Sequence, residues 1–141
     1  MKILILCTGN SCRSQMAEGF LKSFDERLQV FSAGTLPSSE VHPLAIKVMQ
    51  DINIDIVGNY PKSVSKYILY DFDYVITVCD DANETCPIFI GNVKNKLHIG
   101  FDDPAKATGT NEHIMSEFIR VRNEIEKEFN YFYNKHLKHI Q

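Results

Sequence analysis

The sequence predicts an α/β fold of three layers, in which a four-stranded parallel sheet is flanked by helices. Short apolar runs alternate along the chain with segments whose apolar residues recur at helical spacing. Strands that alternate with helices pair in parallel, because each crossover returns the chain to the same end of the sheet. The chain has 141 residues with no repeat and no linker, so one domain over residues 1–141 is expected.

Four segments are expected to be strands. Residues 2–6 form a continuous apolar run, which is typical of a strand covered on both faces. Residues 74–78, with the sequence Tyr-Val-Ile-Thr-Val, are the clearest strand. Residues 30–33 and 96–99 are expected to complete the sheet, the latter with a weaker pattern. Residues 52–56 alternate as well but can equally form an extended connection.

Helices are expected between these strands. Ser14 can cap the first helix, and Pro43 can open the second. Residues 63–70 can hold a short helix. From about Asn111 a long helix is expected, because apolar residues follow one another in steps of three or four and so form one stripe. The stripe consists of Ile114, Phe118, Val121, Ile125, Phe129 and Phe132.

Composition and charge exclude several classes of protein. The chain is 44% hydrophobic and 23% charged, which is an ordinary globular balance, and no apolar run nears the roughly 18 residues of a membrane span. The first residues lack the length and the cleavage site of a signal peptide. A net charge of −3 without a basic stripe argues against nucleic-acid binding. A cytoplasmic monomer with reduced cysteines is expected.

The loop after the first strand carries the strongest functional signal. It reads CTGNSCRS from Cys7 to Ser14, so that a cysteine and an arginine stand in Cys-X5-Arg spacing. Backbone N–H groups between a strand and a helix can form an anion cradle. Gly9 and Asn10 tolerate the positive φ that such a loop needs. Arg13 adds a planar fork of donors that suits a tetrahedral oxyanion.

We therefore expect the loop to bind an oxyanion and to present Cys7 as the nucleophile. The positive surroundings favour the thiolate form of Cys7. Cys12 is expected to pack as a buried thiol under the cradle, and Ser14 to bond the Cys7 thiolate. The competing interpretation is a buried Cys7 that merely ends a strand, with Arg13 at the surface. The expected oxyanion-binding residues are Thr8, Gly9, Asn10, Ser11, Cys12, Arg13 and Ser14.

The segment from Cys7 to Ser14 resembles the phosphate loop of the low-molecular-weight tyrosine phosphatase fold. Residues 13–19, RSQMAEG, resemble its arsenate-reductase branch, whereas phosphatases of this fold commonly have proline in place of Gln15. The resemblance implies the fold of these phosphatases and an enzyme of arsenical resistance that reduces arsenate. It continues through residues 31–34, 73–88 and 100–104 into the last helix.

Two further cysteines bear on the choice between reduction and hydrolysis. From their spacing alone, Cys79 and Cys86 are either two structural thiols or a pair that a flexible loop brings together, since a rigid helix would hold them about 10 Å apart. The resemblance implies a thioredoxin-coupled relay with a redox-active disulfide. In this relay Cys7 attacks arsenate, Cys79 attacks the sulfur of Cys7, and Cys86 takes over the disulfide. Thioredoxin, or glutaredoxin with glutathione, then reduces the disulfide.

An aspartate before a proline is the expected general acid. The resemblance implies that Asp103, which precedes Pro104, protonates the departing oxygen. The neighbouring Asp102 is expected to be a solvated turn residue. Phosphatases of this fold usually continue with aromatic residues that grip a phenyl ring, but Ala105 and Lys106 follow here. This difference weakens the case for tyrosine phosphate as the substrate.

A potassium-type site is also implied by the resemblance. Asn10, Glu18 and Ser32 match such a site in some of these reductases, and the position of its aspartate falls on Lys62. We therefore expect the ammonium group of Lys62 to replace the ion. No other metal and no cofactor is expected, because the chain has no Cys-X2-Cys pair and its histidines lack the spacing of metal ligands.

Two alternatives remain open at the level of the sequence. A low-molecular-weight protein tyrosine phosphatase would hydrolyse phosphate monoesters through a phosphocysteine on Cys7, without needing Cys79 or Cys86. A non-catalytic redox or oxyanion sensor would bind the anion, or oxidise at the cysteine pair, without turnover. Residual phosphatase activity can also accompany arsenate reduction, because phosphate and arsenate are similar tetrahedral oxyanions.

Overall fold

The chain folds around a four-stranded parallel sheet in a computed structural model that describes residues 1–80 and 88–138. The strands lie in the order β2-β1-β3-β4, and each neighbouring pair is parallel. All four predicted strands are confirmed, although β3 and β4 begin earlier than predicted. Their bounds are β1 (Lys2–Cys7), β2 (Gln29–Gly34), β3 (Asp71–Thr77) and β4 (Asn92–His98).

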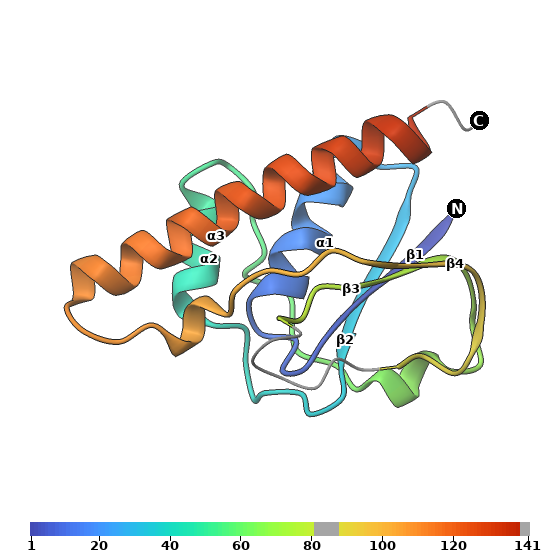
Figure 1. Cartoon of the computed structure of the whole chain (residues 1–141), viewed down its shortest axis with the longest axis horizontal. Coiled ribbons are helices and arrows are strands. Elements are labelled where there is room, and N and C mark those ends of the chain that lie inside the picture. Colours follow the sequence, from blue (N-terminus) through green and yellow to red (C-terminus); the bar gives the residue numbers. More distant parts are fainter. Residues whose placement is uncertain (81–87, 139–141) are drawn as a thin grey trace.

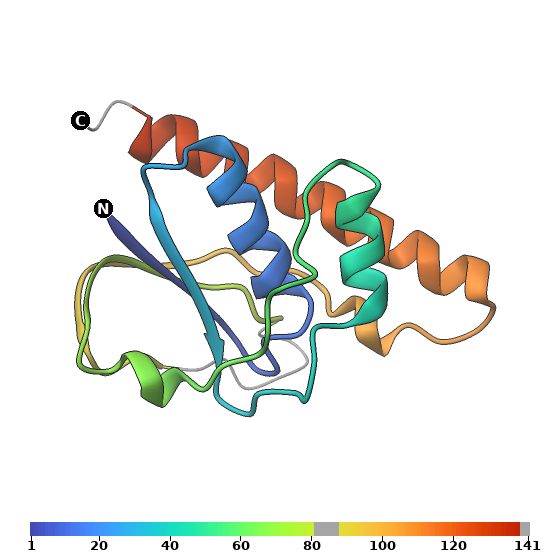
Figure 2. The ribbon, with the colours of Figure 1, turned by 180° about the vertical axis from the view of Figure 1, so that it is seen from behind.

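The helices form two layers around this sheet. Within the described residues, three α-helices gather on one face of the sheet, and a short 3-10 helix lies on the other (Figures 1 and 2). The sheet is therefore the middle of three layers, as predicted. The α-helices are α1 (Arg13–Phe24), α2 (Pro43–Gln50) and α3 (Asn111–Phe132). The shorter turns are the 3-10 helices η1 (Val64–Tyr67) and η2 (Pro104–Lys106), and the π-helical η3 (Tyr133–Leu137).

Strand β1 divides the core into two parts. Its side chains alternate in direction, so Ile3 and Ile5 pack among the α-helices while Leu4 and Leu6 pack on the side of η1. All four are fully buried, which explains why the strand is an uninterrupted apolar run. The stripe predicted for α3 is buried except for its first residue, Ile114, which is partly buried. No helix in the described ranges has the length and apolar content to cross a membrane.

The helix starts differ in how well local sequence predicts them. Helix α2 begins at Pro43 as predicted, with His42 as its N-cap. The prediction that Ser14 caps α1 is wrong. The helix begins at Arg13, and Cys12 at the N-cap makes no side-chain capping hydrogen bond. The loop after β1 runs straight into the helix, which places Ser14 inside the first turn.

A charged network ties the turn after α1 to η3. The carboxylate of Asp25 accepts hydrogen bonds from Arg27 Nε at 2.9 Å and Nη2 at 2.8 Å, and from the Tyr133 hydroxyl at 3.0 Å. These hydrogen bonds, chiefly those from Arg27, hold the pKa of Asp25 well below its ordinary value of 3.8. A group of this kind stabilises the fold above its unfolded pKa and loses that contribution as the pH falls.

We expect Asp25→Asn to lower the free energy of unfolding at pH 7, because the substitution removes the carboxylate from this network. The deficit should shrink as the pH falls below 3.8, because the Asp25 carboxylate of the unfolded chain then gains a proton while that of the folded protein stays ionised. Urea unfolding across this pH range measures the difference, with Glu126→Gln on the exposed side of α3 as the control. A deficit that stays constant at all pH values contradicts the prediction.

Candidate active site

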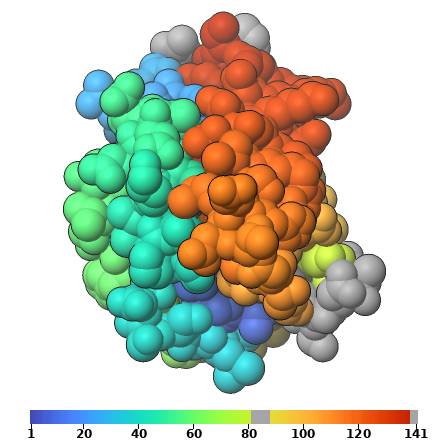
Figure 3. All heavy atoms as spheres, turned by 90° about the vertical axis from the view of Figure 1, so that its left-hand side faces the viewer, coloured from blue at the N-terminus to red at the C-terminus, as the bar shows by residue number. Residues whose placement is uncertain are grey.

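The loop of residues 7–13, here called the oxyanion loop, lies at the carboxyl end of β1. Figure 3 shows the deep blue start of the chain in a hollow between the teal segment that leads into α2 and the orange segment around the start of α3. Strand β2 ends against the loop at Gly34. A Cβ atom at this position would lie 2.3 Å from the carbonyl oxygen of Thr8, so only glycine allows the approach.

The carbonyl groups of the oxyanion loop are held from outside the loop. Those of residues 8, 9 and 11 accept backbone N–H groups from segment 36–42 at 3.0, 2.9 and 2.9 Å. The carbonyl of Asn10 accepts from the Gln15 side chain at 3.1 Å. In a planar trans peptide the C=O and N–H groups point in opposite directions. The N–H groups of residues 9–12 therefore turn toward the interior of the loop, which is the arrangement that an anion cradle requires.

Asn10 makes the sharp bend in the loop. Its φ is 52°, and its side chain is fully buried. Its Oδ1 accepts from the backbone N–H of Lys62 at 2.9 Å, and its Nδ2 donates to Ser14 Oγ at 2.7 Å. A positive φ was expected at Gly9 too, but the structure has it only at Asn10 within the loop. Gly9 is needed for space instead, since a Cβ atom there would lie 2.9 Å from Ser38 Oγ.

Arg13 lies beneath the loop and is 3% exposed. Its Nη1 donates to the carbonyl oxygen of Phe101 at 3.2 Å, and its Nη2 lies 3.6 Å from Asp103 Oδ2. The other carboxylate oxygen of Asp103 accepts from the backbone N–H of Ala105 at 3.0 Å. The Asp103 side chain is 21% exposed, so solvent reaches it. The structure thus brings the predicted arginine and the predicted acid together.

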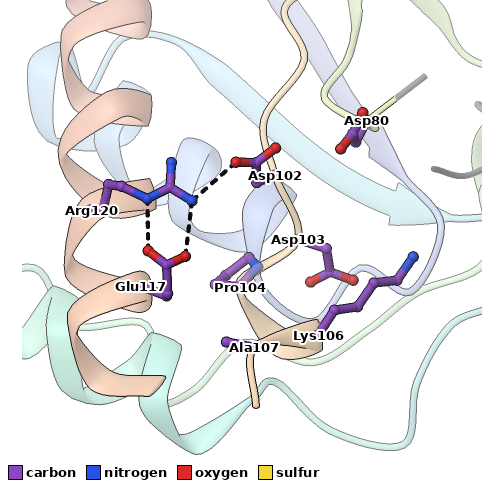
Figure 4. A pocket seen from close by; sticks show the side chains of 8 residues that line it. All are labelled: Asp80, Asp102, Asp103, Pro104, Lys106, Ala107, Glu117 and Arg120. Atoms are coloured by element: carbon purple, nitrogen blue, oxygen red, sulfur yellow. Dashed lines mark hydrogen bonds and ion pairs between the residues drawn. The ribbon is translucent and has the colours of Figure 1, made fainter. Parts of the chain in front are cut away.

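Asp102 has different surroundings from Asp103. Its side chain is 62% exposed, and its Oδ2 accepts from Arg120 Nη2 at 3.0 Å. Arg120 also pairs with Glu117, and the two aspartates border a cavity of about 240 Å³ (Figure 4). Asp103 and Lys106 line the part of this cavity that lies away from Arg120 and Glu117 (Figure 4). Sequence reasoning missed Arg120, which anchors the segment that carries Asp103.

Three reduced cysteines, Cys7, Cys12 and Cys79, belong to one buried cluster. The register of the sheet brings Cys7 and Cys79 to the same edge of the sheet. Leu6 of β1 pairs with Thr77 of β3, so Cys79 lies one residue beyond the position opposite Cys7. If the ladder continued past Leu6 and Thr77, the spacing of neighbouring strands and the rise per residue would hold the two Cα atoms roughly 6 Å apart. This separation is within the range that a disulfide can bridge.

Cys12 lies within the described residues, whereas Cys86 does not. Burial raises the pKa of the Cys12 thiol to about 12. Its Sγ lies 3.6 Å from Ser11 Oγ. Cys12 therefore stays a neutral thiol at pH 7, which suits a packing role. Cys86 lies outside the described residues, and its place in a relay remains a prediction.

The residues of the predicted potassium-type site are gathered behind the loop. Glu18 accepts from Ser32 Oγ at 2.6 Å and from Lys22 Nζ at 2.7 Å. Glu18, Lys22 and Lys62 line one cavity. The ammonium group of Lys62 donates to the carbonyl oxygen of Tyr60 at 2.8 Å. Burial lowers the pKa of Lys62, while the charge of Glu18 opposes this change. Sequence reasoning missed Lys22, although its spacing of four residues from Glu18 on a helix is a usable signal.

Comparisons with known proteins agree with this geometry. Residues 2–141 match the family described as low molecular weight phosphotyrosine protein phosphatase. The arsenate reductase of Halalkalibacterium halodurans is 45% identical over 131 residues, which cover 92% of this chain and 93% of that protein.

Comparison with solved structures also finds arsenate reductases. One described as an arsenate reductase in the phosphate binding state has a TM-score of 0.78 and 30% identity, over 95% of this chain and 97% of the other. A thioredoxin-dependent arsenate reductase of Corynebacterium glutamicum has a TM-score of 0.57 and 27% identity, over 93% of this chain and 62% of the other. The oxyanion loop, the parallel sheet and these matches together show that the chain belongs to the low molecular weight phosphotyrosine protein phosphatase family.

Proposed function

We propose that this protein is an arsenate reductase in which Cys7 attacks arsenate and Cys79 and Cys86 pass the resulting disulfide to thioredoxin. The placement of Cys79 just beyond β3, at the same edge of the sheet as Cys7 and in the same buried cluster, is the observation that carries the proposal. Hydrolysis of a phosphate ester needs no second thiol at this point. The 45% identity to an arsenate reductase over most of the chain supports arsenate as the substrate.

The first step is nucleophilic attack on the bound oxyanion. The N–H groups of residues 9–12 and the guanidinium of Arg13 neutralise the negative charge of arsenate. The Cys7 thiolate attacks arsenic, so that an S–As bond forms and one As–O bond breaks. Asp103, close to Arg13, donates the proton with which the departing oxygen leaves as water.

The second step transfers electrons to arsenic. The Cys79 thiolate attacks the sulfur of Cys7, an S–S bond forms, and the S–As bond breaks with its electron pair on arsenic. Arsenic leaves as arsenite. The Cys86 thiolate then attacks Cys79 and expels the Cys7 thiolate, which is ready for another arsenate. A dithiol partner reduces the Cys79–Cys86 disulfide and becomes a disulfide itself.

Thioredoxin is the proposed partner, and the cytoplasm is the proposed compartment. The similarity to a thioredoxin-dependent arsenate reductase of Corynebacterium glutamicum supports thioredoxin. The chemistry supports the cytoplasm, because all three thiols must start reduced and cytoplasmic reductants maintain that state. Glutaredoxin with glutathione is the competing reductant.

Steady-state arsenite formation with thioredoxin, thioredoxin reductase and NADPH tests the proposal. We expect one arsenite for each NADPH oxidised, and no turnover when thioredoxin is omitted. Turnover with glutaredoxin and glutathione but not with thioredoxin would show that the partner is wrong. Hydrolysis of phosphotyrosine without any arsenite would favour the phosphatase alternative.

Lys62 gives a separate prediction about potassium. We propose that its ammonium group, together with Lys22, supplies the positive charge at Glu18 that an ion supplies in some reductases of this type. The activity of the unsubstituted protein should then be equal in potassium and sodium chloride. Lys62→Asp should lower the activity in sodium chloride about tenfold, because a second carboxylate then lines the cavity that Glu18 lines, and potassium should restore the activity.

The matched control is Lys127→Asp, which makes the same change of charge on the exposed side of α3. It should show equal activity in the two salts. A steep rise in the activity of the unsubstituted protein with added potassium would contradict the role given to Lys62.

A further inference from the structure

The four carbonyl groups of residues 8–11 are held by two kinds of donor. Three accept backbone N–H groups from segment 36–42, which side-chain substitution leaves in place. The carbonyl of Asn10 instead accepts from Nε2 of Gln15 at 3.1 Å. One part of the oxyanion loop therefore depends on a single side chain, and that side chain is outside the loop.

The surroundings of Gln15 fix the orientation of its amide. Gln15 is fully buried in the first turn of α1. Its Nε2 also donates to the carbonyl oxygen of Tyr60 at 3.2 Å, and its Oε1 accepts from Asn59 Nδ2 at 3.1 Å. Turning the amide over would set two pairs of acceptors and one pair of donors against each other. The donor of Gln15 is thus held toward the Asn10 carbonyl.

The peptide between Asn10 and Ser11 is the part of the loop most in need of such support. Asn10 has a φ of 52°, a left-handed conformation that asparagine tolerates better than most residues but that still costs free energy. Rotation of this peptide plane would turn the Asn10 carbonyl into the cradle and the Ser11 N–H out of it. A donor to the oxyanion would be replaced by an acceptor that repels it.

We propose that Gln15 is a positioning residue for oxyanion binding. By holding the Asn10 carbonyl outside the loop, it keeps the N–H of Ser11 directed at the bound anion. The identity of the anion as arsenate rests on the proposed function. The positioning role itself applies to any tetrahedral oxyanion, so inorganic phosphate serves as a probe that needs no turnover.

Gln15→Met tests this role, because methionine fills a similar volume without an amide. Without the Gln15 amide, the peptide between Asn10 and Ser11 is free to rotate. If it is rotated in about nine-tenths of the unliganded molecules, the apparent Kd for inorganic phosphate rises about tenfold. The KM for arsenate should rise by a similar factor, while kcat at saturating arsenate is retained because the bound anion restores the loop. In ¹H–¹⁵N spectra the Ser11 amide should shift in the free variant and return to its usual position with saturating phosphate.

Two other variants serve as controls. Gln50→Met makes the same change at the exposed end of α2 and should leave the Kd unchanged. Gln15→Glu keeps the shape of the side chain but presents carboxylate oxygens to two carbonyls. It should weaken phosphate binding at least as much as Gln15→Met does, and it decides the question if Gln15→Met does not fold.

The outcomes separate this inference from the proposed function. A folded Gln15→Met protein with an unchanged Kd for phosphate would overturn the inference, as would a fall in kcat at an unchanged KM. If both variants at Gln15 fail to fold, the residue is structural and the inference is overturned as well. Failure of the unsubstituted protein to form arsenite would instead overturn the proposed function and leave the phosphate comparison valid.

Discussion

Replacing Cys7 with serine is expected to abolish arsenate reduction, with a loss on the order of 10⁴-fold or more. Cys7 ends β1 at the entrance to the oxyanion loop and is 2% exposed. A serine hydroxyl is far less acidic than a thiol and cannot form the S–As bond or the disulfide that follows. Any hydrolysis of phosphate esters should disappear with it. Arsenite formation and p-nitrophenyl phosphate hydrolysis measure the two losses.

The Cys7→Ser protein should still bind inorganic phosphate. The N–H groups of residues 9–12 and the Arg13 guanidinium are unchanged by the substitution, and they supply the anion site. Calorimetric titration with phosphate therefore serves as the control for folding. Arsenite formation by Cys7→Ser above the rate without enzyme would show that another residue is the nucleophile.

Replacing Cys86 with serine is expected to limit the protein to one turnover. Cys79 can still attack the sulfur of Cys7 and release arsenite, but the Cys7–Cys79 disulfide then has no internal thiol to resolve it. Rapid-mixing experiments should show one arsenite for each protein molecule, followed by no further product in the presence of thioredoxin. Mass spectrometry should find the Cys7–Cys79 disulfide in the exhausted protein.

Cys79→Ser is the matched variant for this experiment. It should release no arsenite even in the first turnover, because nothing breaks the S–As bond by attack on sulfur. Phosphate ester hydrolysis, where present, should persist in both variants, since it uses Cys7, Arg13 and Asp103. Continued reduction of arsenate by Cys86→Ser with thioredoxin at the normal rate would contradict the three-thiol relay.

The same measurements separate the two alternatives. A phosphatase would hydrolyse phosphate esters equally fast before and after substitution of Cys79 or Cys86, and would form no arsenite. A sensor would bind phosphate and oxidise at its cysteines but form no product repeatedly. Only the proposed reductase loses arsenate turnover in both variants while keeping its anion site.

The sheet was predictable where local sequence reflects burial on both faces. Strand β1 is apolar throughout because its alternating side chains enter two cores, and so its bounds were nearly correct. Strand β4 is the edge of the sheet and most of its residues are exposed. Its pattern is therefore weak, and the prediction missed its first residues. The cap at Ser14 was misplaced because a suitable residue type does not reveal where a loop becomes a helix.

The oxyanion loop could be predicted from local sequence, because strand, cysteine, asparagine, arginine and helix follow one another along the chain. The surroundings of the loop depend on contacts between segments that are distant in the sequence. Parallel pairing of β1 with β3 brings Cys79 to the same edge of the sheet as Cys7, and the approach of the 101–103 segment places Asp103 against Arg13. Packing of α1 turns Gln15 toward the Asn10 carbonyl. These contacts join residues through folding in three dimensions, so no local pattern records them.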